Sequence, residues 1–225
     1  MEEQLTTTLI TGLTTLSISP KDEIVAKLIK YIQELELFYA AYDLVGADST
    51  KDIIIRHILD SLSAYTEIKT LIDEQKKLQN TETITIGDIG TGGGLPGIPL
   101  AICFPEVNFI LVERMSKRCA FLENCGAILN LQNLTVMNIE AEKCSQSLVD
   151  IAVFRAFRPL DKKMIQTLLK IIKTQGKLAA YKAKSDKIQE EMNGIATYVT
   201  GWYKKSLSVP FLENTERNLV IIPKN

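Results

Sequence analysis

A glycine-rich segment that directly follows a short β-branched run constrains the fold more than any other feature of this chain. Residues 83–89 are typical of a strand, and residues 90–97 read Gly-Thr-Gly-Gly-Gly-Leu-Pro-Gly. Glycines permit positive φ angles and let a ligand lie against the backbone, and a helix that begins just beyond offers unpaired N–H groups. A tight strand-to-helix loop without a ligand is the alternative, and so many glycines argue against it. The segment therefore predicts a nucleotide-type cofactor turn.

The rest of the chain after Thr83 repeats the same alternation of strand and helix, which is typical of βα units and a parallel sheet. We predict strands near 83–89, 108–113, 133–138, 150–155 and 177–182, and helices near 96–103, 116–129, 161–174 and 185–193. Two β-rich segments, 198–209 and 218–223, follow with no helix between them and predict a final antiparallel hairpin. The fold class is therefore α/β, a Rossmann-like parallel sheet with an antiparallel C-terminal hairpin strand.

The first eighty residues predict N-terminal helices that precede this sheet. Ser19 and Pro20 are typical of a helix start, and apolar residues then recur at helical spacing to about Tyr39. A second helical stretch, with capping residues between Asp48 and Thr50, continues past Ile72. We therefore expect a helical lead-in of residues 1–80, packed on a core domain of residues 81–225.

Three polar residues of the second stretch, His57, Asp60 and Ser61, have the spacing that places side chains on one helical face. Two interpretations remain open for them. They line the mouth of a site, or they form an internal hydrogen-bond network that holds the lead-in helices to the sheet.

The charge of the chain limits how it can contact nucleic acid. The net charge of −1 argues against a domain that coats nucleic acid by bulk electrostatics. Residues 1–80 hold 8 Lys and Arg against 13 Asp and Glu, whereas residues 81–225 hold 18 against 14. Any nucleic-acid contact is therefore expected on the later region.

Neither a membrane segment nor a metal site is expected. No stretch approaches the roughly 20 continuous apolar residues of a spanning helix, and the chain begins with Glu2 and Glu3, unlike a signal peptide. A cytoplasmic protein is expected. The cysteines form no CxxC pair and have a single histidine to join them, so we expect free, partly buried thiols. They are Cys103, Cys119, Cys125 and Cys144.

Two carboxylates bear on which cofactor the turn binds. The turn glycines also satisfy the dinucleotide pattern G-x-G-x-x-G, and Glu113 at the end of the second strand would accept bonds from ribose hydroxyls in either kind of enzyme. Asp88 favours S-adenosylmethionine, because a carboxylate there can hold the amino-acid end of that cofactor but would repel a pyrophosphate. No Gly-Lys-Ser/Thr follows, which excludes a P-loop.

These residues resemble a known family, the bacterial 16S rRNA guanine-N7 methyltransferases long called glucose-inhibited division protein B, or methyltransferase G. The resemblance covers most of the chain. It rests on residues 88–99 (Asp-Ile-Gly-Thr-Gly-Gly-Gly-Leu-Pro-Gly-Ile-Pro), on Lys117-Arg118 with Phe121-Leu122, on Arg155-Ala156, on the helix motif 57–62 and on residues 216–220.

The resemblance implies a class I methyltransferase sheet, S-adenosyl-L-methionine as cofactor, and methylation of N7 of a guanine in the decoding-region loop of 16S rRNA. The substrate would be the small ribosomal subunit or a precursor, and the enzyme a monomer without DNA or membrane partners. The implied cofactor-binding residues, together with those of the turn, are Asp88, Gly90, Thr91, Gly92, Gly94, Leu95, Glu113, Ala141, Glu142 and Arg155. The residues expected at the reaction site are Arg155, Lys182 and Arg217. Two positions depart from the family pattern, which usually has Arg where Glu140 stands and Gly where Ala183 stands.

The chemistry of an N7 target fits the residues near the strand ends. Guanine N7 has an in-plane lone pair and no proton, so positioning supplies most of the catalysis and no general base is needed. The Asn/Asp-Pro-Pro-aromatic motif of amine methyltransferases is replaced by Phe154-Arg155-Ala156-Phe157. Guanidinium groups suit guanine O6 and N7 as well as phosphate. Each of Arg155, Arg158, Lys182 and Arg217 has the alternative of being a solvated surface charge.

Other functions remain open at this point. A small-molecule methyltransferase would have an enclosed site, whereas an RNA enzyme would have an open basic surface. A non-catalytic cofactor-binding ribosome-assembly module and an NAD-dependent oxidoreductase are further alternatives. We expect Trp202 and Phe154 to belong to the core and not to stack on a base.

Overall fold

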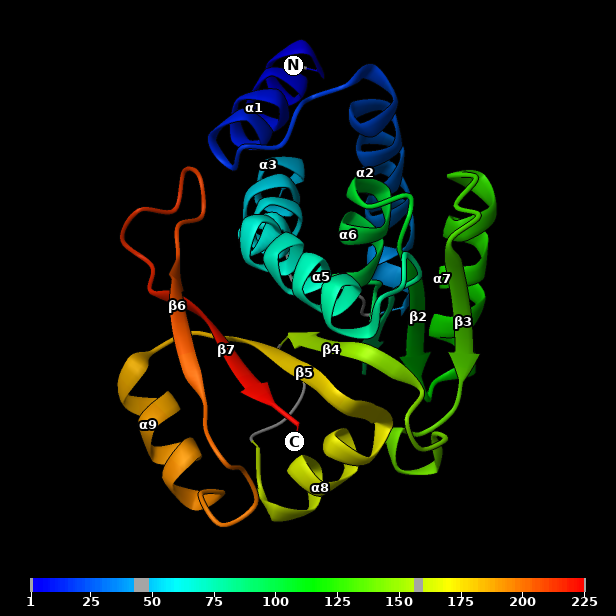
Figure 1. The fold of residues 1–225 in the computed structure, drawn as a ribbon. Helices are drawn as coiled ribbons and strands as arrows, with labels where there is room; N and C mark the ends of the chain where they lie inside the picture. The colour runs from blue at the N-terminus through cyan, green and yellow to red at the C-terminus, as the bar shows by residue number, and fades with distance from the viewer. Residues whose placement is uncertain (1, 43–48, 156–159, 225) are drawn as a thin grey trace.

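The computed structural model describes residues 2–42, 49–155 and 160–224, and within them the strands form one seven-stranded sheet with the order β3-β2-β1-β4-β5-β7-β6 (Figure 1). The strands are β1 Thr85–Ile89, β2 Asn108–Glu113, β3 Leu134–Asn138, β4 Val149–Arg155, β5 Ile172–Lys182, β6 Tyr203–Leu207 and β7 Arg217–Pro223. The first five are parallel, and β7 runs antiparallel to both β5 and β6. The predicted α/β class and the final antiparallel hairpin are confirmed.

The helices that connect the parallel strands also follow the prediction. They are α6 Gly97–Cys103, α7 Ser116–Ile128, α8 Lys162–Ile171 and α9 Ser185–Gly194, with a short 3₁₀ turn, η2, at Ala141–Lys143. The predicted end of α8 near residue 174 is wrong, because Ile172 already pairs with Val149 as the first residue of β5. Ile172 is β-branched and buried, which favours the strand.

The lead-in is helical, as expected, but its helices differ in detail. They are α1 Glu2–Thr15, α2 Asp22–Tyr42, α3 Thr50–Asp52, the π-helix η1 Ile53–Leu59, α4 Asp60–Leu62 and α5 Tyr65–Gln79. The predicted start of α2 at Ser19 and Pro20 is wrong, because the Ser19 carbonyl accepts from Lys21 N at 2.9 Å in a turn that precedes the helix. The cap of the second stretch is Ser49, whose Oγ accepts from Asp52 N at 3.2 Å, and Asp48 lies outside the described residues.

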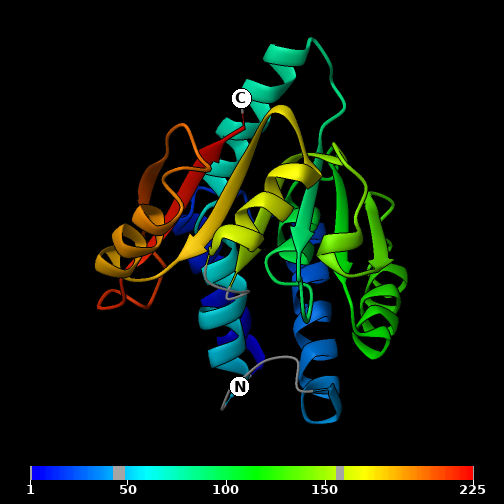
Figure 2. The same ribbon diagram turned by 90° about the horizontal axis from the view of Figure 1, so that it is seen from below.

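Helices cover both faces of the sheet. Alternate strand residues such as Ile86 and Ile151 face a cluster that includes α1, α2, η1, α5, α6 and α7, whereas Ala152 and Phe154 face α8 and α9. Figure 1 shows the lead-in helices above the sheet, and Figure 2 shows α8 across its middle with α9 beside β6 and β7. The lead-in therefore shares one hydrophobic core with the sheet.

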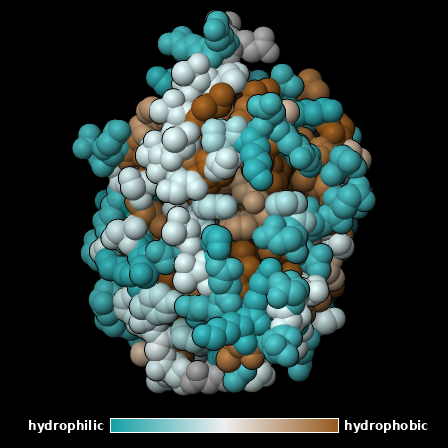
Figure 3. Space-filling view, turned by 45° about the horizontal axis from the view of Figure 1, so that its top comes forward, coloured by the Kyte–Doolittle hydropathy of each residue, from teal (hydrophilic) through white to brown (hydrophobic). Residues whose placement is uncertain are grey.

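The outer surface of the lead-in side is mixed. Figure 3 shows a few apolar patches there among hydrophilic side chains, which is ordinary for a protein surface. Among the described residues, no helix combines the length and the apolar character needed to cross a bilayer.

A buried carboxylate ties the end of α5 to the amino end of the parallel strands, opposite the glycine turn. Asp150 of β4 is fully buried and accepts from Gln79 Nε2 and from Thr85 N, each at 2.8 Å. It also forms an ion pair with Lys173 at 2.9 Å. Gln75 of the same helix donates to the Gln175 carbonyl at 2.9 Å. These bonds fix α5, and with it the segment that precedes α5, against the sheet.

We predict that Asp150→Ala lowers the free energy of unfolding by roughly 1–3 kcal/mol, because the partly buried Thr85 N–H and the Gln79 amide lose their acceptor. Urea denaturation followed by circular dichroism measures this change. Asp73→Asn is the control, since Asp73 pairs only with the exposed Lys69 in the described part of the chain. Equal stability of both variants would contradict the role given to Asp150.

Candidate active site

The turn after β1 is shaped by glycines in the left-handed region. The φ angles are 71° at Gly90, 60° at Gly92 and 94° at Gly94. The amides of Gly90 and Thr91 donate to the Val112 carbonyl at 2.9 and 3.2 Å, which ties the turn to the end of β2. Glycine adopts these angles freely, whereas other residues do so at a cost of roughly 1–2 kcal/mol.

The glycines of the turn differ in what lies beside them. A Cβ at Gly94 would come within 2.6 Å of Ile98, and one at Gly97 within 2.3 Å of Leu111, so both allow α6 to pack closely on the sheet. A Cβ at Gly92 would meet only the Arg118 guanidinium, at 4.0 Å. The backbone of Gly92 therefore borders open space, and a ligand can approach the main chain there.

Asp88 is fully buried near the carboxyl end of β1. Its Oδ2 accepts from Thr91 Oγ1 at 2.6 Å and from Gly97 N at 2.8 Å, so it holds both ends of the turn. Its Oδ1 has no hydrogen-bond partner among the described residues. Burial raises the pKa of Asp88 from 3.8 to about 6, and the bonds from Thr91 and Gly97 oppose that rise. One carboxylate oxygen shapes the turn, and the other remains to accept from a donor.

Glu113 joins the turn to the start of α7. The residue is 5% exposed; Oε2 accepts from Gly92 N at 3.1 Å and Oε1 accepts from Met115 N at 2.9 Å. An ionised carboxylate has about four lone-pair sites, so these two bonds leave capacity for hydroxyl donors. Asn138 supports the same loop by donating to the Glu113 and Arg114 carbonyls at 3.2 and 3.1 Å.

A residue that the sequence analysis did not single out, Tyr31, also reaches the turn. It is fully buried on α2, and its hydroxyl donates to the Gly93 carbonyl at 2.5 Å. The only local signal is a tyrosine at an apolar position of the helical stripe between Leu28 and Leu35. The contact spans 62 residues of sequence, so no local pattern predicts it.

The remaining predicted cofactor residues border the same region. Leu95 is buried at the end of the turn, and its amide donates to the Thr91 carbonyl at 3.1 Å. Ala141 and Glu142 form η2, beyond the carboxyl end of β3. Ala141 is 7% exposed, and Glu142 pairs with Lys163 of α8 at 3.9 Å. These residues therefore follow β1 and β3, on either side of Glu113 at the end of β2.

Arg155, at the end of β4, is held by the helical segment that contains Asp60. Its Nη1 donates to Asp60 Oδ2 at 2.8 Å and to the Arg56 carbonyl at 3.0 Å, and its Nη2 lies 3.4 Å from His57 Nδ1. Arg217 of β7 donates through Nε to Asp60 Oδ1 at 3.0 Å. The Ser61 carbonyl accepts from the Tyr181 hydroxyl of β5 at 2.8 Å.

Both open interpretations of His57, Asp60 and Ser61 thus hold in part. The three residues connect the lead-in to the sheet, and His57 and Asp60 also line a cavity of about 1080 Å³. His57 and Asp60 lie on one side of the segment, as expected, because both contact Arg155, and the Ser61 hydroxyl donates to the His57 carbonyl at 2.6 Å. The helix type differs from the expectation, because residues 53–59 form a π-helix.

The cavity contains all three residues predicted at the reaction site. Arg155, Lys182 and Arg217 lie on its wall, with Phe154, Leu160 and Leu207 as apolar lining. Lys182 pairs with Glu191 of α9 at 2.8 Å and lies 5.3 Å from the centre of the Phe154 ring. These three cations are ion-paired and only partly exposed, so the alternative of solvated surface charges does not apply to them.

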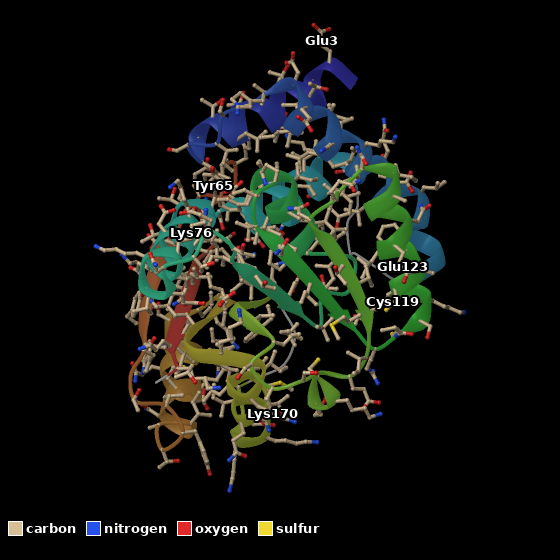
Figure 4. The ribbon with its side chains drawn as sticks, turned by 45° about the vertical axis from the view of Figure 1, so that its right-hand side comes forward. Glu3, Tyr65, Lys76, Cys119, Glu123 and Lys170 are labelled. Atoms are coloured by element: carbon tan, nitrogen blue, oxygen red, sulfur yellow. The ribbon has the colours of Figure 1, made fainter. Side chains whose placement is uncertain are left out.

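Several further predictions concern single residues of the core and of the quoted motifs. Phe154 is 1% exposed and Trp202 packs against the same cluster, so both belong to the core as expected. Arg158, with Ala156 and Phe157 of the quoted motif, lies outside the described residues. The four cysteines are free and buried, and burial raises the pKa of Cys103 to about 12. Cys119 lies in the first half of α7, with Sγ donating to the Glu113 carbonyl at 3.3 Å (Figure 4).

Comparisons with known proteins agree with this geometry. The family described as rRNA small subunit methyltransferase G matches residues 24–220. A protein of Treponema denticola named ribosomal RNA small subunit methyltransferase G is 41% identical over 96% of this chain and 93% of its own length. One of the same name from Hydrogenovibrio crunogenus is 35% identical, covering 90% of this chain and 87% of its own.

The chain belongs to this family of rRNA methyltransferases. The family predicted from the sequence is thereby confirmed, and with it the small-subunit rRNA methyltransferase activity. Solved structures of low sequence identity share the fold. The tRNA methyltransferase TrmI of Aquifex aeolicus has a TM-score of 0.55 at 13% identity, covering 73% of this chain and 68% of its own. YcgJ of Bacillus subtilis has a TM-score of 0.54 at 13% identity, covering 72% and 98%.

We predict that Gly92→Ala weakens the binding of S-adenosylhomocysteine at least about tenfold, because the added methyl group occupies the open space beside the backbone. Isothermal titration calorimetry measures the affinity. The strained φ of 60° also costs roughly 1–2 kcal/mol of stability, which thermal unfolding reports separately.

Gly201→Ala is the matched control, because a Cβ there meets nothing within 4 Å and the affinity should not change. Wild-type affinity in Gly92→Ala would place the ligand away from this turn.

Proposed function

We propose that this methyltransferase transfers the methyl group of S-adenosylmethionine to N7 of a guanine in 16S rRNA, with the methyl donor against the Gly90–Gly94 turn and the guanine at the cavity beside Arg155. The observation that carries the proposal is that the two regions are neighbours. Strand β1 pairs directly with β4, with Asp88 opposite Val153, so the turn after β1 lies next to the side chain that ends β4.

The residues of the turn fit the proposed donor. The open space beside Gly92 admits a ligand to the backbone, and the unpartnered Oδ1 of Asp88 suits the cationic amino group of the cofactor. Glu113 retains acceptor capacity for ribose hydroxyls. When bound, S-adenosylmethionine supplies a methyl group on a positively charged sulfur, which is open to attack by a lone pair. Asp88 and Tyr31 already hold the turn by hydrogen bonds, so it would present its backbone to this ligand in a fixed position.

The cavity fits a guanine substrate in RNA. Guanine N7 needs no general base, so the residues required are donors that orient the base and bind phosphate. Arg155, Lys182 and Arg217 provide such donors, and the half-buried Leu207 adds apolar surface. At about 1080 Å³ the cavity is slightly larger than the roughly 300–1,000 Å³ that is usual for small-molecule sites. A single flipped-out nucleotide therefore has room in it.

The preferred form of the substrate follows from charge. With a net charge of −1, the enzyme has little non-specific attraction to RNA and must depend on the shape of a folded target. We therefore propose that the small ribosomal subunit, or a precursor of it, outcompetes short linear oligonucleotides, and that the target guanine lies in the decoding-region loop.

We predict that the affinity for S-adenosylmethionine falls by about tenfold per pH unit below pH 6, because protonation of Asp88 removes the charge that its amino group meets. Calorimetry between pH 5 and pH 8 measures this dependence, and Asp88→Asn should flatten it. Stability should respond in the opposite sense. The pKa is higher in the folded chain, about 6, than its ordinary 3.8, so the folded form binds the proton more tightly and this group favours folding as the pH falls through that window. An unchanged affinity from pH 8 to pH 5 would exclude Asp88 from the cofactor contact.

We predict that ribosomal RNA from cells that lack this protein loses one site of borohydride- and aniline-induced cleavage. N7 methylation leaves the guanine ring positively charged and open to reduction and strand scission, so this chemistry reports the product directly. The wild-type gene should restore the site, and Arg155→Ala should not, because Arg155 lies on the wall of the cavity proposed for the guanine, where Asp60 holds it. The same cleavage pattern in the deletion strain would rule out this target, even where the cofactor affinity is as expected.

A further inference from the structure

One short segment of the lead-in contacts the carboxyl ends of β4 and β5 and the amino end of β7. Residues 56–61 accept hydrogen bonds from Arg155 of β4, from Tyr181 of β5 and from Arg217 of β7. The contacts join residues 95 to 157 positions apart in the chain. They bring two guanidinium groups, which come from strands that are not adjacent in the sheet, to a single carboxylate.

Asp60 is that carboxylate, and both of its oxygens are engaged. Oδ2 accepts from Arg155 at 2.8 Å and Oδ1 from Arg217 at 3.0 Å, and the side chain is only 8% exposed. Arg155 and Arg217 are 15% and 25% exposed, so the group is partly shielded from water. One negative charge between two positive ones leaves the triad with a net charge of +1 at the wall of the cavity.

The guanidinium groups keep donors beyond these contacts. An arginine has five N–H groups, and the bonds of Arg217 to Asp60 and to the Glu216 carbonyl use two of them. Asp60 therefore fixes the plane of each guanidinium without using up its capacity to donate. A planar donor group held in one orientation is what recognition of a guanine edge or a phosphate requires.

The local helix geometry contributes to the placement of Asp60. The π-helix η1 ends immediately before it, and the Asp60 amide donates to the carbonyls of both Ile55 and His57. A π-helical turn changes the direction of the side chains that follow it relative to an α-helix, and such turns are frequent at functional sites. His57, within this π-helix, and Asp60, directly after it, both contact the same arginine, Arg155.

We propose that Asp60 is a positioning residue for methyl transfer: it acts through Arg155 and Arg217, whose guanidinium groups it orients toward the target nucleotide. This inference rests on the proposed function, because it assigns the two arginines to the RNA and not to the cofactor. The cofactor turn is held by other residues, Tyr31, Asp88 and Glu113, so loss of Asp60 leaves the turn intact.

The test is Asp60→Asn, which keeps the size of the side chain and replaces one acceptor oxygen by an amide that cannot accept from an arginine. We expect kcat/KM on small ribosomal subunits to fall about 10- to 100-fold, with affinity for S-adenosylhomocysteine within twofold of wild type. Asp73→Asn, the exposed control on α5, should match wild type in both measurements. A parallel fall of activity, cofactor affinity and melting temperature in Asp60→Asn would indicate a purely structural role and overturn the proposal.

A double-mutant cycle shows whether Asp60 acts through its partner. If it does, Asp60→Asn combined with Arg217→Gln should lower kcat/KM little more than the more severe single variant, whereas two independent effects would multiply and would contradict the proposal.

An arginine-selective reagent gives a readout that does not depend on methyl transfer. Phenylglyoxal labelling of Arg155 and Arg217, followed by mass spectrometry, should increase in Asp60→Asn relative to Asp73→Asn, and unchanged labelling would count against the assigned pairing. Failure of the proposed function is distinct from these outcomes, because it appears as absence of methyl transfer by the wild-type protein. In that case the affinities of Asp60→Asn and Asp73→Asn for small ribosomal subunits test the positioning role. The role requires that Asp60→Asn binds more weakly than wild type and that Asp73→Asn does not.

Discussion

The pairing of β1 with β4 is the constraint on which the site depends. Successive strands run outward from β1 in one direction to β3, and the chain then returns to place β4 on the other side of β1. In an open parallel sheet, the connections on the two sides of such a reversal diverge and leave a crevice at the carboxyl ends of the strands. The glycine turn after β1 lies on one side of that crevice, and Arg155 after β4 lies on the other. Two chemically different half-sites are therefore adjacent because of the strand order itself.

The lead-in helices complete both halves of this crevice. Tyr31 of α2 donates to the carbonyl of Gly93, and Asp60 accepts from Arg155. Each contact is buried or nearly so, which makes it directional and costly to lose. The shared hydrophobic cluster brings these helices onto the sheet, but the polar contacts determine where the turn and the arginine stand relative to each other. The lead-in thus contributes to the candidate site, although it precedes the sheet in the sequence and supplies none of the loops at the carboxyl ends of the strands.

The sequence predicts those parts of the molecule whose signal is local. The alternation of strands and helices, the glycine turn, and the carboxylates at the ends of β1 and β2 all follow from spacing within a few residues, and the observed elements match them closely. The start of α2 was predicted wrongly, because the Ser19-Pro20 signal leads into a turn before the helix begins. Asp60 with Arg155, and Tyr31 with Gly93, could not be predicted from pattern, because nothing near either residue specifies a partner 95 or 62 positions away. The π-helix at residues 53–59 is a further feature that the spacing of apolar residues does not distinguish from an α-helix.

The pairing of the site cations explains how an acidic chain can act on RNA. A surface of free lysines and arginines attracts any phosphate backbone, and its affinity falls steeply with salt. Here Arg155 and Arg217 share Asp60, and Lys182 pairs with Glu191, so much of their charge is compensated within the protein. Compensated cations contribute little long-range attraction, but their fixed N–H groups still discriminate among acceptors at contact distance. In the proposed function, specificity for one nucleotide comes from the fit of a folded RNA to these few donors. The charge is compensated in this way because each cation stands on a strand and each carboxylate on a helix that packs against the sheet: Asp60 lies on α4 and Glu191 on α9.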